Sequence, residues 1–422
     1  RDAPALPPDR LRPAGDDRAF VTSPAAVLGT PRPSARLALL LTTLVALGPL
    51  STDLYLPALP TLARVFASDA AGVQLTLSVF LAGFACGQIF YGPLSDRCGR
   101  RPALLGGLAL YCLGSLGCIF APDIATLIGA RFVQALGACA GPVIGRAIVR
   151  DIWGGSESAR IIAYMGSAMA IAPLVGPTLG GFLTVLCGWQ SNFVLLLLIA
   201  GGQLLVVART LGESNLRRDP GATSPRQMLA NFAELLANRA YLGYLLTFSF
   251  SYSALFAFIS ASSFVLAERH GLTPQIYGIC FGSVVAGYLL GSLISGRLVR
   301  RLGSDRLLLI GAWVGAVAGL GMALLEFSGV HTLAAILVPM FFCTMATGLV
   351  MPNAIARALA PYPDMAGSAS ALMGFVQMTV AALVGIAVGH GLSSGGAALA
   401  TAVAICTLLA PVSWYLLLRR SR

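Results

Sequence analysis

An isolated acidic residue lies inside the first apolar run of the chain. Asp53 lies within the run 37–61, about 6 Å from its midpoint at the helical rise of about 1.5 Å per residue. Where such a run crosses a membrane, a carboxylate at that depth is costly unless it is paired, hydrated or protonated. Asp53 therefore has the chemistry of a proton-exchanging group. The alternative is a polar cap on a helix that Pro57 and Pro60 end early.

A basic residue lies at a matching depth in the fourth apolar run. Arg131 is about 9 Å from the middle of the run 125–148, on the same side as Asp53. A guanidinium keeps its charge, so it needs an acidic or carbonyl partner there, and Asp53 is the nearest acid by depth. We predict that Arg131 pairs with Asp53 and modulates its proton affinity. The alternative is an arginine that snorkels to the interface.

The composition predicts that these residues lie in membrane-spanning helices. Hydrophobic residues make up 57% of the chain and charged residues 11%, which leaves too few polar residues to cover a soluble globule. Apolar runs of about 20 residues recur, the length that crosses a bilayer, and backbone in lipid must pair internally, as in helices. We predict an all-α polytopic membrane protein. Its twelve expected spans are 37–61, 73–94, 102–121, 125–148, 160–186, 189–211, 240–265, 275–299, 305–326, 331–354, 366–390 and 394–418.

A glycine pattern indicates that the spans form two equivalent halves. Gly83, Gly87, Gly92 and Gly99 recur 204 positions later as Gly287, Gly291, Gly296 and Gly303. An even number of spans per half gives both halves the same orientation, a parallel repeat. The predicted organisation is a disordered N-terminal tail (1–36), a six-helix half (37–211), a linker (212–239), a second six-helix half (240–418) and a short tail (419–422).

The arginines predict the orientation in the membrane. The chain has no lysine, and 25 of its 28 arginines lie in the tails, in the linker or at span ends on one side, including the segment 146–160. This bias predicts that both termini are cytoplasmic in an inner or plasma membrane. The net charge of +11 suggests nucleic acid, but arginines scattered between spans do not form a phosphate-binding face.

A dense group of charges separates the second and third spans. In the loop from Gly92 to Gly99, Asp96 is placed to cap the next helix or meet a neighbouring helix dipole. Arg97, Arg100 and Arg101 are placed to meet headgroups. The alternative is that these charges only set the orientation. The second copy has Arg300 where the first has Asp96, so the glycines, not the acid, are the shared requirement.

The fifth span combines helix-bending and close-packing residues. Pro173 and Pro177 bend a helix, whereas Gly176, Gly180 and Gly181 let a neighbouring helix approach. The segment is either a hinge or seal, or simply a packing surface.

Polar and aromatic residues inside the spans are candidates to line a cavity between the halves, although each alone is more often packing material. They are Tyr55, Gln88, Gln134, Tyr252, Phe256, Met340, Phe375 and Gln377.

The sequence carries no pattern for a metal site or for catalysis. Its nine cysteines are an odd number, lie mostly inside spans and form no CxxC motif. We expect no disulfide, metal or cofactor, and a transporter rather than an enzyme. A membrane-embedded transferase, the remote alternative, needs a cluster of carboxylates or histidines that the sequence lacks.

These motifs resemble those of the major facilitator superfamily, and within it the twelve-helix drug–proton antiporters. The residues GPLSDRCGRR (92–101), RFVQALG (131–137) and GPTLGG (176–181) are similar to its signature loop, its helix-four motif and its helix-five antiporter motif. The residues DLYLPALP (53–60), GSASALMG (367–374) and Gln377 resemble the bicyclomycin/chloramphenicol-resistance subfamily. The resemblance covers about residues 37–418.

The resemblance implies proton-driven export of amphipathic drug-like compounds by alternating access. It also implies that Asp53 and Arg131 are the coupling pair and that the signature loop is the cytoplasmic gate. Arg300 in the second copy of the loop departs from the pattern. The expected partners are a small amphipathic substrate, protons and membrane lipid, with no nucleic acid, and we expect a monomer. The alternative is the same fold serving as an importer or exporter of a specific metabolite.

Overall fold

The protein folds into fifteen α-helices and one short 3-10 helix in the residues that the structure describes. This computed structural model describes residues 33–153, 155–216, 218, 223–362, 365–392 and 395–418, and these contain no strand. Residues 1–32 of the predicted N-terminal tail (1–36) and the predicted tail 419–422 lie outside the described residues, and helix α1 already includes Ala35 and Arg36. The elements are α1 (Ala35–Asp53), η1 (Leu56–Ala58), α2 (Leu59–Val65), α3 (Ala70–Cys98), α4 (Arg100–Ile119), α5 (Ile124–Ala138), α6 (Ala140–Ile152), α7 (Gly155–Cys187), α8 (Gln190–Thr210), α9 (Pro225–Ala237), α10 (Arg239–His270), α11 (Pro274–Leu302), α12 (Ser304–Phe327), α13 (Leu333–Leu359), α14 (Ala366–Gly391) and α15 (Gly396–Leu418).

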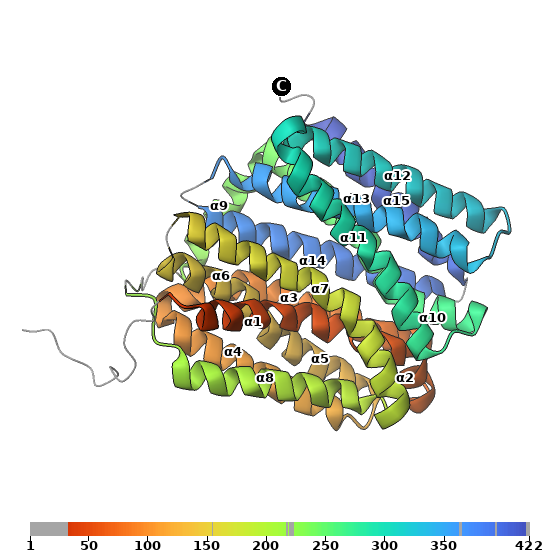
Figure 1. Cartoon of the computed structure of the whole chain (residues 1–422), viewed down its shortest axis with the longest axis horizontal. Helices are drawn as coiled ribbons and strands as arrows, with labels where there is room; N and C mark the ends of the chain where they lie inside the picture. Colours follow the sequence, from red (N-terminus) through yellow and green to blue (C-terminus); the bar gives the residue numbers. More distant parts are fainter. Residues whose placement is uncertain are drawn as a thin grey trace, which may run out of the picture.

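The predicted all-α architecture with twelve spans is confirmed. Twelve helical segments in the described part of the chain are long and apolar enough to cross a membrane. The helices of these segments run side by side (Figure 1). Two spans are each built from consecutive helices, α1 with α2 and α5 with α6. Helix α9 lies in the linker at one end of the bundle, which we call the α9 end, and the other end is the opposite end.

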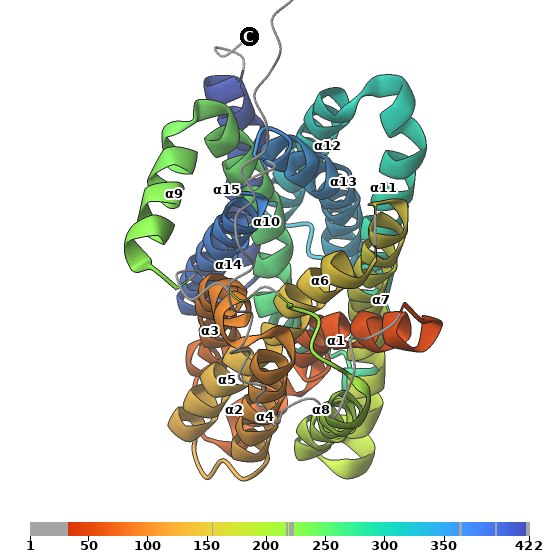
Figure 2. The ribbon, with the colours of Figure 1, turned by 90° about the vertical axis from the view of Figure 1, so that its left-hand side faces the viewer.

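The two halves of the sequence form two groups of helices. Helices α1–α8 pack in one group and α10–α15 in the other (Figure 2). The main contacts between the groups pair α3 with α14 and α7 with α11. Elements η1 and α2, which follow the break after α1, add contacts to α10, and η1 also contacts α11. The interface is therefore formed by equivalent helices of the two repeats.

The repeated glycines occupy equivalent environments in the two halves. A Cβ on Gly83 would lie 2.8 Å from the backbone oxygen of Phe132, and one on Gly287 would overlap the backbone oxygen of Phe341. These contacts join α3 to α5 and α11 to α13, so both pairs of helices pack through a glycine against a carbonyl.

The last glycine of each copy is the N-cap residue, immediately before a helix. Gly99 precedes α4 with φ of 105°, and Gly303 precedes α12 with φ of 78°. Backbone angles of this kind favour glycine, which explains why the glycine persists while the charges around it change.

Each half also has an ion pair that joins the same two equivalent helices. In the first half, Arg100 at the start of α4 contacts Asp151 near the end of α6, with Nε 3.0 Å from Oδ2. In the second half, Asp305 at the start of α12 contacts Arg357 near the end of α13, with Oδ1 3.0 Å from Nε. The repeat therefore preserves the position of the ion pair and exchanges its two charges, a symmetry that the comparison of Asp96 with Arg300 in the sequence does not show.

Candidate functional site

The first span is broken immediately after Asp53. Helix α1 ends at Asp53, and the chain resumes as the short helix η1 after two turn residues. Pro57 lies four residues after Asp53 and has no N–H to donate to the Asp53 carbonyl, so the α-helical ladder stops there. The break positions a titratable side chain beside a backbone carbonyl that lacks its helical donor, inside a membrane-spanning segment, an arrangement found at ion sites of transporters.

Helix α7 packs its glycines against this break. A Cβ on Gly176 would lie 3.4 Å from the Cβ of Asp53, and a Cβ on Gly180 would overlap the carbonyl oxygen of Leu54. One residue on, a Cβ on Gly181 would overlap the carbonyl oxygen of Pro274 in α11. The glycine motif is thus a packing surface on two sides, between the break in α1 and the second half.

The same part of α7 runs as an uninterrupted helix through both of its prolines. Helix α7 extends from Gly155 to Cys187 with Pro173 and Pro177 inside it. On the α11 side, a Cβ on Gly278 would lie 2.6 Å from the carbonyl oxygen of Pro177. These contacts join the last part of α7 to the first turns of α11. The close backbone contact between the two helices therefore lies toward the opposite end of the bundle.

Asp53 faces the boundary between the halves. Its side chain is 2% exposed, and its Oδ1 accepts a hydrogen bond of 3.0 Å from the Thr52 hydroxyl. Its carboxylate also lies within electrostatic range of Tyr252 in α10 and Tyr277 in α11. Two phenol groups of the second half are therefore near enough to interact electrostatically with the acid of the first half. Tyr277 does not stand out in the sequence because it lies in the first turns of its span, where aromatic residues are common.

Arg131 is buried in the first half, and its contacts differ from those predicted. Its side chain is fully buried, and Nη1 donates a hydrogen bond of 2.5 Å to Oε1 of Gln134. The guanidinium carbon lies 4.4 Å from the ring centroid of Tyr55 and 4.2 Å from that of Phe80. No ion pair joins Arg131 to Asp53 among the described residues. The predicted contact is therefore not formed in this conformation, where aromatic faces and an amide surround the guanidinium.

The guanidinium of Arg131 has fewer hydrogen-bond partners than donors. Its Nε and Nη2 atoms have no hydrogen-bond partner among the described residues. Gln134, which holds Nη1, donates in turn to the Ser115 hydroxyl at 2.8 Å. Buried donors without partners are rare and mark positions retained for something other than stability.

This arrangement predicts that Arg131→Met gives a folded protein with impaired transport. Removing a buried charge that has no anionic partner should leave the thermal midpoint of the purified protein unchanged or raise the free energy of unfolding by about 1 kcal/mol or more. Methionine still fits between aromatic rings. We expect transport to fall at least about tenfold. Arg64→Met, at an exposed position near the end of α2, is the matched control, and a large drop in the midpoint of Arg131→Met alone would show a structural role instead.

Most of the residues predicted to line a cavity are packed in the interior. Tyr55 and Gln134 belong to the Arg131 cluster, where the Tyr55 hydroxyl pairs with the Thr76 hydroxyl at 2.9 Å. Phe256 and Met340 are fully buried core residues. These four positions are packed against other protein groups in this conformation, and hydropathy does not show which face of a helix meets its neighbours. Tyr252 and Phe375 are half-buried.

Two glutamines of α3 lie in the seam with α14. Gln88 is 8% exposed, and its side-chain amide lies 2.5 to 2.7 Å from where a Cβ on Gly374 would be. Gln74 has the same relation to Gly389 nearer the opposite end. Gln377, on α14, is 5% exposed. Gln88 and Gln377 are therefore interface residues of the two halves, and the glycines of α14 make room for long polar side chains.

The charged loop predicted from Gly92 to Gly99 is helical as far as Cys98, so Gly99 alone separates α3 from α4. This charged junction, which we continue to call the charged loop, is fixed by a residue that the sequence pattern did not single out. Glu213, in the linker after α8, accepts hydrogen bonds from the backbone N–H groups of Arg100 and Arg101, at 2.9 Å and 3.3 Å. A carboxylate at a helix N-terminus is stabilising, so Glu213, not Asp96, caps α4. Asp96 instead pairs with the Arg100 side chain. In the sequence, Glu213 is an acidic residue two positions after the predicted span 189–211. Nothing distinguishes it there from an ordinary linker charge.

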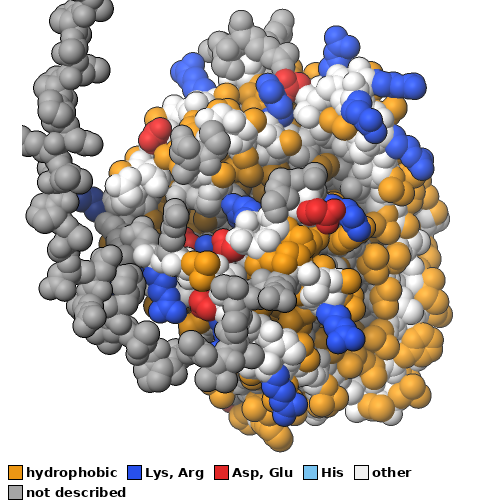
Figure 3. Space-filling view, turned by 60° about the vertical axis from the view of Figure 1, so that its left-hand side comes forward, with side chains coloured by type: hydrophobic (Ala, Val, Ile, Leu, Met, Phe, Trp, Pro, Cys, Tyr) orange, Lys and Arg blue, Asp and Glu red, His pale blue; other side chains and the backbone are white. Residues whose placement is uncertain are grey.

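The remaining arginines of the loop also bind the first half and the linker. Arg101 donates to the backbone oxygen of Ala208 at 2.9 Å, and Arg97 donates to the Thr223 hydroxyl at 2.9 Å. Charged side chains gather on this end of the molecule, and apolar side chains cover the flank beyond it (Figure 3). None of the hydrogen bonds that these arginines form with described residues reaches α14, so the predicted gate is not engaged with the second half in this conformation.

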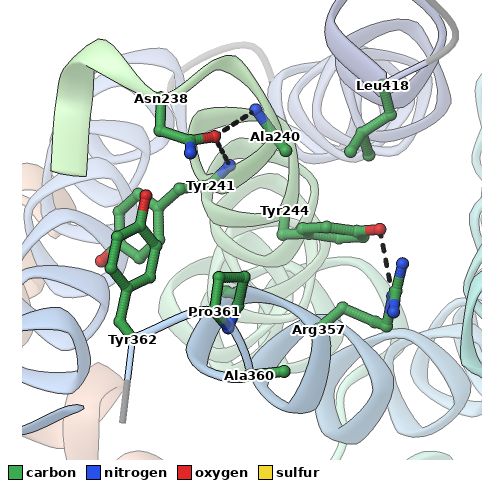
Figure 4. A pocket seen from close by; sticks show the side chains of 10 residues that line it. Asn238, Ala240, Tyr241, Tyr244, Arg357, Ala360, Pro361, Tyr362 and Leu418 are labelled. Carbon is green, nitrogen blue, oxygen red and sulfur yellow. Dashed lines mark hydrogen bonds between the residues drawn. The ribbon is translucent and has the colours of Figure 1, made fainter. Parts of the chain in front are cut away.

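A pocket of about 240 Å³ opens at the α9 end of the second half. Tyr241, Tyr244 and Tyr362 line it, with Arg357 at its edge (Figure 4). Arg357 is already bound to Asp305 and donates to the Tyr244 hydroxyl at 3.3 Å. This pocket lies within one half, away from Asp53, and is not the predicted cavity between the halves.

All nine cysteines are free thiols, and the described residues contain no cluster of His, Cys, Asp or Glu that fits a metal ion.

Known proteins are similar to this chain in sequence and in fold. The Major Facilitator Superfamily profile matches residues 41–386. The chain is 34% identical to the uncharacterized MFS-type transporter YdgK of Bacillus subtilis, over 86% of this chain and 91% of that protein. It is 27% identical to Multidrug resistance protein D of Escherichia coli, over 82% and 86% of the two chains, and 27% identical to a bicyclomycin resistance protein homolog of Haemophilus influenzae, over 89% and 94%.

A solved structure has the same architecture. The crystal structure of a D-xylose–proton symporter superposes with a TM-score of 0.72 at 16% identity, covering 90% of this chain and 96% of that one. At this identity the likeness shows the fold alone. The resemblance drawn from the motifs is confirmed, and the chain belongs to the major facilitator superfamily as a multi-pass secondary transporter.

Proposed function

We propose that this transporter exports amphipathic drug-like compounds in exchange for protons. The observation that carries the proposal is Asp53, a buried carboxyl at a helix break, facing the second half of the protein. A group in this position changes its surroundings when the halves move, so proton uptake and release follow the alternation of the two states. The names of the relatives, a multidrug resistance protein and a bicyclomycin resistance protein homolog, support the drug-like substrate and the outward direction.

We further propose that the α9 end faces the cytoplasm. Arginines at the described span ends, in the segments 97–101, 146–160 and 297–306, lie there, as expected for the inner side of a membrane. Toward the opposite end, the glycine-mediated contact of α7 with α11 seals the two halves at backbone distance. At the α9 end, the charged loop binds its own half. These contacts support an inward-facing state, closed at the outer end.

The proton gradient supplies adequate energy for such export. Moving one charge through 100 mV is worth about 2.3 kcal/mol, and each 1.4 kcal/mol is about a tenfold concentration ratio. One proton per substrate therefore sustains a gradient of about fiftyfold.

The test compares cells with and without the protein for their accumulation of a panel of neutral, anionic and cationic amphipathic dyes and antibiotics. We expect lower accumulation of at least one compound, and we expect a protonophore to restore it. A protonophore that lowers accumulation in the expressing cells instead would identify a proton symporter. A panel with no affected compound would favour a transporter of one specific metabolite.

A further inference from the structure

A second arginine lies inside the fourth span. By its place in the sequence Arg146 belongs with the charges that set orientation, but α6 continues to Ile152. Arg146 is thus six residues, or about 9 Å along the axis, inside the end of the helix. An arginine inside a membrane-spanning segment needs a partner or an aqueous surface.

The packing of α6 shows which way Arg146 points. Around the helix, Cys139 faces Gly87 of α3, Gly141 faces Leu44 of α1, and Gly145 faces Met165 of α7. Cys139 precedes α6 but has α-helical backbone angles, with φ of −67° and ψ of −22°, so the helical period holds from Cys139 onward. At about 100° per residue, Arg146 lies about 20° from the direction of Cys139, within the sector between α3 and α7.

This sector is turned toward the second half. Helix α3 packs on α14, and α7 packs on α11, so the space between α3 and α7 faces the other group of helices. In the view onto the α9 end, α6 lies at the boundary of the two groups (Figure 2). Arg146 therefore borders the path between the halves, on the side of the α9 end.

Arg146 has no partner of opposite charge among the described residues. Its side chain is half-buried. None of the ion pairs among the described residues includes its guanidinium, and the hydrogen bond found at Arg146 is one that its backbone carbonyl accepts from Arg150. The groups that interact with it electrostatically are the Cys139 thiol and the like charge of Arg150. Arg131, in contrast, is enclosed by rings and an amide, and Arg100 is paired with two acids. A guanidinium that is only partly hydrated and lacks a counter-ion is suited to bind a carboxylate, sulfonate or phosphate group.

We propose that Arg146 is an anion-binding subsite of the transport path, and that the protein accepts neutral and anionic amphipathic compounds in preference to permanent cations. The proposal rests on the proposed function in one respect, that the substrate passes between the halves.

The anion subsite and the proton site are far enough apart to act separately. Leu44 of α1 and Gly141 of α6 are at the same level. From there, Asp53 is about 13 Å toward the opposite end and Arg146 about 7 Å toward the α9 end, because the two helices run in opposite directions. An anion held at Arg146 therefore does not compete for the proton of Asp53, about 20 Å away along the axis.

The experiment measures binding of two fluorescent probes to the purified full chain in phosphatidylcholine nanodiscs, with empty discs subtracted. The first probe is 8-anilinonaphthalene-1-sulfonate, and the second is N-phenyl-1-naphthylamine, which has the same rings without the sulfonate. We expect Arg146→Gln to weaken binding of the sulfonate about tenfold and to leave the neutral probe within about twofold. Arg146→Lys should retain most of the sulfonate affinity, and Arg150→Gln, at an exposed position one turn away, should retain all of it.

The proposal is wrong if Arg146→Gln weakens both probes equally, if it weakens neither, or if the parent protein does not distinguish them. Repeating the measurement in discs that contain phosphatidylglycerol identifies the source of the anion. If this lipid abolishes the difference between parent and Arg146→Gln, a lipid headgroup occupies the site and the substrate subsite is overturned. Because binding is measured without a gradient, the result does not depend on the direction of transport or on its coupling to protons.

Discussion

Gly180→Ala is expected to disable the transporter. The added methyl group would overlap the carbonyl oxygen of Leu54, and this oxygen is backbone at a helix break and cannot rotate away. Helices α1 and α7 must separate, at a cost of about 3 kcal/mol or more for overpacking. The separation also moves Asp53, which packs on the same face of α7 at Gly176. We expect a lower thermal midpoint of the purified protein and a loss of at least about tenfold in drug export.

Gly166→Ala on the same helix is the matched control. Among the described residues, a Cβ at Gly166 would have no atom within 4 Å apart from its own helix, and alanine is the better helix former by about 1 kcal/mol. This variant should be as stable and active as the parent protein. If Gly180→Ala behaves like Gly166→Ala in both assays, then the close packing of α7 on the break is not required.

The sequence predicted the spans and the repeat well because these depend on one coordinate, the position along the chain. Hydropathy fixes where each helix enters and leaves the apolar layer, and the glycine offset of 204 follows from packing that both halves share. Gly99 and Gly303 illustrate the second point, since both have the positive φ that begins the next helix. Features of this kind are local, so they can be recognised before any contact is known.

The contacts of the charged residues depend on direction around each helix, which depth along the chain does not give. Asp53 and Arg131 have similar depths, yet the first faces the second half and the second faces rings of its own half. Both spans are also broken, at Asp53 and near Cys139, so a helical wheel drawn from the sequence loses its phase there. Glu213 was missed for another reason. Its role depends on the linker folding back so that its carboxylate reaches the first backbone N–H groups of α4, and the sequence does not show this path.

Asp53→Asn should abolish proton-driven export and preserve the fold. Asparagine has the same shape, and its Oδ1 can still accept the hydrogen bond of Thr52. It cannot bind and release a proton, so the pump loses its link to the gradient. The steady-state substrate gradient, about fiftyfold for one proton at 100 mV, should collapse to about one.

Substrate exchange separates this loss of coupling from a general loss of transport. In liposomes loaded with unlabelled substrate, Asp53→Asn should still take up labelled substrate by counterflow, because exchange moves no net proton. Asp123→Asn is the control: Asp123 caps α5 outside the spans, where its carboxylate accepts a hydrogen bond of 2.7 Å from the Thr126 backbone, and export should persist. If Asp53→Asn still exports against a gradient in a protonophore-sensitive manner, the proton is carried elsewhere. If it loses counterflow as well, then Asp53 serves the helix break or the substrate rather than the proton.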